Sequence, residues 1–177
     1  MPLILRTIRK AKWYRNDPLP WLSPDELQAD ALVDLNTKGN ALSVYLVKED
    51  DAEALERLVT ALAANRDSIK ELDYALFADD ILSEIGIKIS AVGGNTPDSV
   101  VNTWHRDLTE LSASKIMRLA DAIRKGARIK RIPGKRIRGL IIDALAANRV
   151  DRAKLRLGPD VVADLEGAVL VVKDRPN

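Results

Sequence analysis

The segment Ala-Leu-Ser-Val-Tyr-Leu-Val-Lys at residues 41–48 decides the expected fold class. Its apolar side chains would lie on both faces of an extended chain, which is typical of a strand covered on both sides. Residues 51–65 follow, with Leu55, Leu58 and Leu62 on one side of an amphipathic helix. A covered strand followed by a packing helix predicts a protein that mixes the two kinds of element in layers.

Three further segments carry apolar patterns that favour strands. Residues 72–77 form a short apolar run, and residues 85–92 alternate apolar with small or polar residues. The sequence Ala-Val-Leu-Val-Val at residues 168–172 indicates a buried strand. We expect residues 41–48, 85–92 and 168–172 to be strands of one sheet.

Helices dominate the second half of the chain. A start signal such as Ser23 before Pro24 precedes apolar residues at helical spacing. Besides residues 51–65, helices are predicted over residues 22–35, 97–110, 113–126 and 135–148, with a short one beginning at Pro159. The hexapeptide Ala-Leu-Ala-Ala-Asn-Arg ends two of them, at residues 61–66 and 144–149, because its residues suit a helix C-terminus.

These elements predict a mixed α/β (α+β) fold in a single layered domain over residues 1–177. It would have a small sheet in its first half, a helical C-terminal part and a closing C-terminal strand. The alternative is a division into a strand-containing part, residues 1–94, and a mainly helical basic part, residues 95–177.

The composition excludes several kinds of site. The 177 residues include no cysteine and one histidine, His105, which excludes a disulfide framework, cysteine-ligated metals and a site with several histidines from one chain. We expect no cofactor and no metal. No stretch resembles a signal peptide or a membrane span, so we expect a soluble cytoplasmic protein without a membrane partner.

The charge is strongly segregated along the chain, although the net charge is only +2. Residues 21–112 hold seven basic and eighteen acidic residues, whereas residues 113–158 hold fourteen basic and three acidic ones. Such asymmetry indicates an interaction surface for nucleic acid, acidic lipid or an acidic protein. The alternative is that the acidic segment neutralises the basic one within the fold.

The basic segment supplies the candidate binding residues. Two predicted helices flank the predicted loop at residues 128–135, and that geometry could contact phosphates. A helix-turn-helix is not expected, because the connection is too long and the second helix too apolar. The candidate residues for binding nucleic acid or a partner are Arg118, Lys125, Arg128, Lys130, Arg131, Lys135, Arg136 and Trp13.

Trp13 stands in a second basic segment near the N-terminus, among Arg9, Lys10 and Lys12. Aromatic and basic side chains together can stack bases and contact phosphates. A tryptophan there can equally pin the N-terminus onto the core or anchor a partner. The interpretation that we favour is the clamp on the core.

An enzymatic role is the least supported hypothesis. Asp79, Asp80 and Glu84 could be carboxylates for a divalent metal, but their spacing to Lys88 does not fit one strand face, and surface acids explain them. His105 borders an apolar stripe and is interpreted as a packed or half-exposed residue.

The leading hypothesis is therefore a non-enzymatic binding or regulatory protein whose basic surface contacts nucleic acid. The second is a protein-interaction module that docks an acidic partner or self-associates, and the third is an enzyme with a carboxylate site. The sequence leaves the oligomeric state open, as it does the choice between DNA and RNA.

Overall fold

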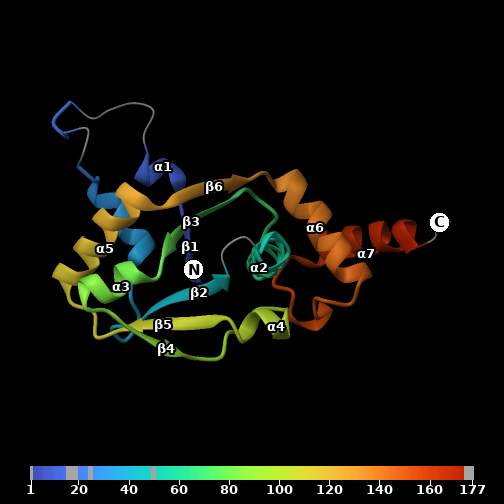
Figure 1. The fold of residues 1–177 in the computed structure, drawn as a ribbon. Helices are drawn as coiled ribbons and strands as arrows, with labels where there is room; N and C mark the ends of the chain where they lie inside the picture. The colour runs from blue at the N-terminus through green and yellow to red at the C-terminus, as the bar shows by residue number, and fades with distance from the viewer. Residues whose placement is uncertain (1, 15–19, 24–25, 49–50, 174–177) are drawn as a thin grey trace. The chain divides into compact units, whose positions relative to one another are not determined.

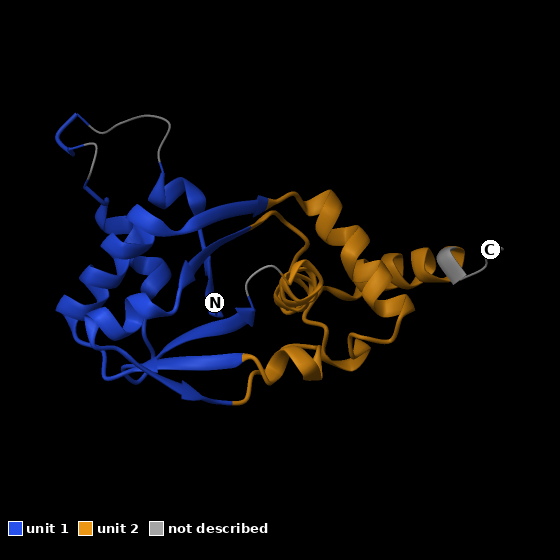
Figure 2. Cartoon of the chain, in the orientation of Figure 1, with its two compact units in different colours: residues 1–49, 73–92, 105–131 blue, residues 50–72, 93–104, 132–177 orange. Residues whose placement is uncertain are grey.

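The computed structural model describes residues 2–14, 20–23, 26–48 and 51–173. It confirms the mixed α+β class (Figure 1). Two compact units form, each from three segments of the chain (Figure 2). Unit 1 contains Met1–Glu49, Asp73–Val92 and His105–Arg131, and unit 2 contains Asp50–Leu72, Gly93–Trp104 and Ile132–Asn177. The expectation of a single domain stays a prediction.

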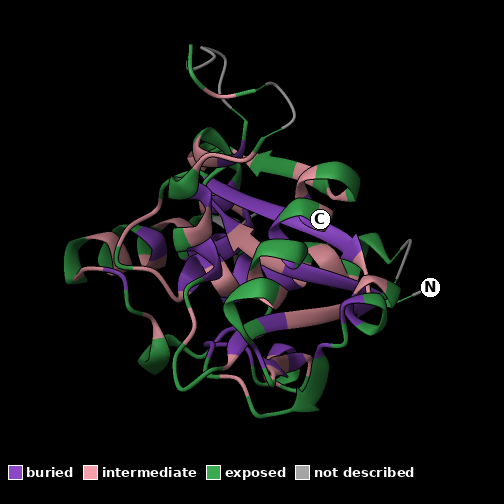
Figure 3. Ribbon diagram, turned by 90° about the vertical axis from the view of Figure 1, so that its left-hand side faces the viewer, coloured by how far each residue is buried: buried purple, intermediate pink, exposed green. Residues whose placement is uncertain are grey.

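Six strands within the described residues form one sheet, in the order β4-β5-β2-β1-β3-β6. They are β1 (Pro2–Ile8), β2 (Leu42–Lys48), β3 (Leu72–Ala78), β4 (Lys88–Ala91), β5 (His105–Thr109) and β6 (Arg128–Ile132). Strand β1 lies between antiparallel neighbours, with Leu5 opposite Tyr45 of β2 and Leu76 of β3. Its apolar residues Leu3, Ile4 and Leu5 are buried, as a central strand requires. Figure 3 colours the ribbon by burial and shows buried strands, in purple, with exposed segments, in green, around them.

The core of unit 1 forms between the sheet and four helical segments. These are α1 (Lys10–Trp13), the 3-10 helix η1 (Ala29–Leu35), α3 (Asp80–Ile85) and α5 (Ala113–Gly126). Ile4 and Phe77 from the sheet pack in one cluster with Leu35 of η1 and with Leu119 and Ile123 of α5. Burying these aliphatic and aromatic side chains stabilises the unit by roughly 1.5–3 kcal/mol each.

Unit 2 is helical and contains α2 (Ala52–Ala64), α4 (Ser99–Asn102), α6 (Gly134–Ala146), the 3-10 helix η2 (Arg152–Lys154) and α7 (Pro159–Lys173). Helix α6 contacts both α2 and α7. Leu58, Ile141 and Leu165, one from each of these helices, are fully buried. Among the described residues, no helix is both long enough and apolar enough to span a bilayer.

Most of the predicted elements are present. Residues 41–48 and 72–77 correspond to β2 and β3, and residues 51–65, 113–126 and 135–148 correspond to α2, α5 and α6. The alternation over residues 85–92 is realised only in part, since Ile85 ends α3 and β4 begins at Lys88.

The prediction of a terminal strand at residues 168–172 is wrong, because this segment continues α7. Pro159 and Asp160 begin the helix as expected, and Leu165 and Val169 are then buried at helical spacing. Burial of this stripe outweighs the strand preference of the valines.

The prediction of a helix over residues 97–110 is also wrong. Helix α4 ends at Asn102, and residues 105–109 form β5, which pairs with β2 and β4. Residues 128–135 are likewise not simply a loop, since they contain β6. Residues 22–35 form a 3-10 helix only from Ala29, while Pro24 and Asp25 lie outside the described residues.

Candidate functional site

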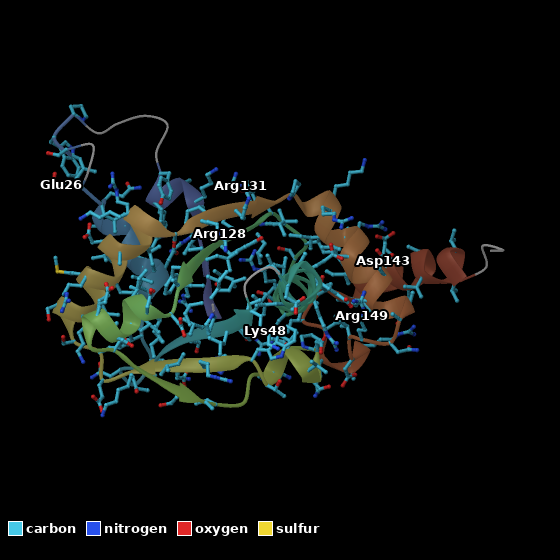
Figure 4. The ribbon with its side chains drawn as sticks, in the orientation of Figure 1. Glu26, Lys48, Arg128, Arg131, Asp143 and Arg149 are labelled. Carbon is cyan, nitrogen blue, oxygen red and sulfur yellow. The ribbon has the colours of Figure 1, made fainter. Side chains whose placement is uncertain are left out.

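Strand β6, with the sequence Arg-Ile-Lys-Arg-Ile, is the last strand in the sheet order. Ile129 is partly buried against the core of unit 1, whereas Arg128 and Lys130 are exposed. The alternation of a strand therefore anchors β6 through an apolar side chain and turns cations to solvent. Arg128 and Arg131 lie along β6 in Figure 4.

Asp73 of β3 joins this strand to the N-terminal segment. Arg131 donates from Nε to Oδ1 at 2.7 Å and from Nη2 to Oδ2 at 2.8 Å, and the backbone N–H of Lys10 donates to Oδ2 at 2.8 Å. Burial acts to raise the pKa of Asp73, but the hydrogen bonds and charges of Arg131 and Lys10 lower it below its ordinary value. The carboxylate thus holds α1 and β6 at the same edge of unit 1.

A second contact joins α1 to the end of α5. The hydroxyl of Tyr14, directly after α1, donates to the carbonyl of Arg124 at 2.9 Å. Arg124 and Lys125 occupy the last turn of α5, where cations interact favourably with the helix dipole.

The three elements together present what we call the basic edge. It consists of Lys10, Lys12, Arg124, Lys125, Arg128, Lys130 and Arg131, all at least partly exposed. Lys125 pairs with Asp121 at 2.7 Å across two solvent-exposed side chains, a contact of small energy. Neither Lys12 nor Lys130 has an ion pair within the part of the chain that the structure describes.

The other predicted binding residues lie elsewhere. Arg118 is exposed on α5 and donates to the carbonyl of Glu84 at 3.0 Å. Lys135 and Arg136 belong to unit 2, where Arg136 pairs with Glu56 at 2.7 Å. The structure therefore brings Lys125, Arg128, Lys130 and Arg131 together in unit 1.

Trp13 is a core residue of unit 1, only 4 % exposed. Its Nε1 donates to Oδ2 of Asp34 at 2.9 Å, and Arg9 donates to the same carboxylate from its backbone N–H and from Nε, each at 2.7 Å. This arrangement pins the N-terminal segment onto the core, which is the clamp that the sequence analysis favours for Trp13. It leaves the indole without a free face for a base, so Trp13 is not part of the basic edge.

Sequence reasoning left Lys10, Lys12 and Arg124 out of the candidate residues. The signal was present, because the N-terminal segment is rich in basic and aromatic residues. The contacts of Asp73 with Lys10 and Arg131, and of Tyr14 with Arg124, join this segment to residues 124–131. They link residues far apart in the chain, and the sequence does not reveal which residues meet.

The acidic residues considered for metal binding lie along α3, with Asp79 and Asp80 at its start and Glu84 near its end. Asp80 begins that helix, and its Oδ1 accepts a hydrogen bond from the backbone N–H of Ile81 at 2.8 Å. The described residues contain no group of three carboxylate or histidine side chains that could hold a metal ion.

His105 is buried on β5 beside polar neighbours. Its Nδ1 lies 3.2 Å from the carbonyl oxygen of Val92, and its ring packs edge-on against Tyr45 with centroids 5.2 Å apart. Ser43 donates to Asp107 at 3.2 Å, and that carboxylate lies 3.8 Å from Nε2 of His105. The carboxylate thus stands between the serine and the histidine, an order that does not activate the serine.

Comparison with models of protein families, with curated proteins and with solved structures finds no significant match to this chain.

Proposed function

We propose that the basic edge of unit 1 binds the phosphate backbone of a nucleic acid, in a protein whose role is binding or regulation rather than catalysis. The observation that supports this most is the convergence of two basic segments, residues 10–12 and 124–131, through the contacts of Asp73 and Tyr14. Because these two segments meet at one edge, their positive charges lie close together. In the sequence the same charges are far apart.

Phosphate binding needs exposed cations, because neutralising a phosphate releases its condensed counterions and so favours association. Lys130 is exposed and Lys12 is partly exposed, and neither has to break an ion pair with another described residue first. Lys125 would exchange a weak surface pair with Asp121 for a phosphate. Arg131 is held by Asp73 and shapes the edge rather than supplying a movable charge.

A structural explanation covers part of the same charge. Basic side chains on an outer strand prevent edge-to-edge pairing with another sheet, and Arg128 and Lys130 would serve that purpose. This explanation does not account for Lys10 and Lys12, which stand on α1 and not on a strand.

The test compares the wild-type protein with Lys12→Gln/Lys130→Gln on duplex DNA, single-stranded DNA and RNA. Wild-type affinity should fall by orders of magnitude between about 50 and about 200 mM salt, and each charge removed should flatten the salt dependence by roughly one unit. The control is Lys38→Gln/Lys70→Gln, which removes two exposed lysines outside the basic edge. No wild-type binding at the lower salt, or equal losses in both variants, would overturn the proposal.

A protein partner is the second candidate, and the exposure of Trp21 favours it. This side chain is 74 % exposed, which is unusual for a tryptophan and suits a hydrophobic anchor. For an acidic protein partner, Trp21→Ala would lower affinity strongly, while edge charges would mainly alter the association rate.

A further inference from the structure

An exposed aromatic residue lies among the cations of the basic edge. Tyr14 directly follows α1 and is 36 % exposed, whereas the neighbouring Trp13 is 4 % exposed. The hydroxyl of Tyr14 donates to the carbonyl of Arg124, in the last turn of α5, at 2.9 Å. Of these two adjacent aromatic residues, Trp13 therefore holds the segment on the core, and Tyr14 presents part of its surface to solvent.

Three hydrogen bonds restrain the position of Tyr14. Besides the bond of its hydroxyl, its backbone N–H bonds to the carbonyl of Lys10 at 2.9 Å, and the backbone N–H of Lys10 bonds to Asp73 at 2.8 Å. An aromatic side chain that is already held in place loses little conformational freedom when a ligand contacts it. The position of the ring therefore favours stacking of a flat group.

The ring is also uncharged at physiological pH. Burial raises the pKa of Tyr14, and the nearby charge of Arg124 only opposes that rise. Because a neutral phenol does not repel phosphates, Tyr14 can contact the same polyanion as the cations of the basic edge.

An aromatic ring on the surface favours a single-stranded nucleic acid, whose unpaired bases can stack on it. Proteins that read a duplex place a helix or a two-stranded ribbon in its major groove. The basic edge has a different construction. Helix α1 has four residues, α5 adds its last turn, and β6 is a single outer strand beside the buried β3.

We propose that the basic edge takes a single-stranded nucleic acid, with one base stacked on the ring of Tyr14 and nearby phosphates neutralised by Lys12 and Lys130. This inference rests on the proposed function, because it assigns the kind of nucleic acid that the same edge binds. An aromatic face accepts every base, so the site selects single strands and not a particular sequence.

Three probes at about 50 mM salt provide the test. They are an oligothymidylate of roughly ten nucleotides, an abasic strand with the same number of phosphates, and a hairpin duplex with that number. The oligothymidylate should bind roughly fivefold or more tightly than the other two. Equal binding of all three would overturn the inference and leave phosphate binding in place, whereas binding of none would overturn both. Oligouridylate in the same titration tells whether RNA or DNA binds more tightly.

Two substitutions of Tyr14 separate stacking from the bond that joins α1 to α5. Tyr14→Leu should weaken oligothymidylate binding by roughly fivefold or more and leave abasic-strand binding unchanged. Tyr14→Phe removes the bond to Arg124 but should retain most of the affinity, because it keeps the ring. The control is Trp21→Leu, which removes an exposed aromatic side chain outside the basic edge. A loss in Tyr14→Phe or in Trp21→Leu equal to that in Tyr14→Leu would overturn the inference.

A measurement on the wild-type protein makes the test independent of the folding of any variant. The ring signals of Tyr14 in an NMR spectrum should shift saturably as oligothymidylate is added, because a stacked base lies directly against the ring. The ring signals of Tyr74, which is 4 % exposed, should stay in place. Unchanged Tyr14 signals, or an equal response to the abasic strand, would overturn the inference.

Discussion

The clamp formed by Trp13 and Asp34 predicts a large loss of stability on truncation. Trp13→Ala removes a side chain that is 4 % exposed, and such changes cost about 3–5 kcal/mol. The Asp34 carboxylate keeps its two donors from Arg9, so little further cost comes from that group. We expect the free energy of unfolding to fall by about 4 kcal/mol, a large part of the ~5–15 kcal/mol typical of proteins.

Trp13→Phe isolates the hydrogen bond to Asp34, because it keeps an aromatic ring and removes the donor. We expect a cost of about 1–2 kcal/mol, and a double-mutant cycle with Asp34→Asn should give a coupling energy of about 1 kcal/mol. Urea denaturation followed by circular dichroism gives the free energy of unfolding of the wild type, the two single variants and the double variant. These values can be compared if the m-value is unchanged. A loss below about 1 kcal/mol for Trp13→Ala, with nucleic-acid binding abolished, would refute the clamp and make Trp13 a binding residue.

Three further changes test other parts of the structure. His105→Gln should leave nucleic-acid binding unchanged and cost about 1 kcal/mol in urea denaturation, through the loss of a hydrogen bond and an aromatic contact; lost binding in a folded variant would contradict this. Because folding lowers the pKa of Asp73, its carboxylate stabilises the folded state at pH values above the pKa that Asp73 has in the unfolded chain. That contribution disappears as the pH falls through the folded pKa, so Asp73→Asn should reduce the acid sensitivity of the melting temperature. Gly139→Ala should stabilise the protein by about 0.5–1 kcal/mol, because Gly139 lies within α6 and a Cβ there meets nothing within 4 Å. Gly86→Ala should destabilise the protein, because Gly86 has a φ of +75°. Equal effects on the free energy of unfolding would contradict both geometries.

The sequence predicted an element correctly where the apolar residues that the element buries form a regular pattern in its own sequence. The stripe of α5, with Leu119 and Ile123 inward, and the two-sided apolar pattern of β2 are examples, and both elements are present. Strand β1 was not predicted, although its central position buries Leu3, Ile4 and Leu5. The interleaved basic and aromatic residues that directly follow β1 favoured a binding segment over a strand in this region.

Long-range pairing explains the two main errors. His-Arg-Asp-Leu-Thr at residues 105–109 has no strand character of its own, and it is extended because β2 and β4 pair with it on both sides. Residues 168–172 have strand character but are helical, because Leu165 and Val169 are buried at helical spacing on α7, which packs against α6. In each case partners distant in sequence override the local preference.

From the sequence, the candidate site could be predicted only as a segment rich in basic residues. The sequence identified Lys125, Arg128, Lys130 and Arg131 as an excess of positive charge. It could not show that Asp73 holds Arg131 and the start of α1 together, because that depends on the register of β6 beside β3.

The most direct test of the basic edge is to map the backbone amide shifts of the wild-type protein as a short oligonucleotide is added at about 50 mM salt, where phosphate contacts are strong. The account predicts saturable shifts concentrated at residues 10–12 and 124–131, which disappear as the salt concentration is raised. Shifts concentrated elsewhere, or none at all at that salt concentration, would contradict it.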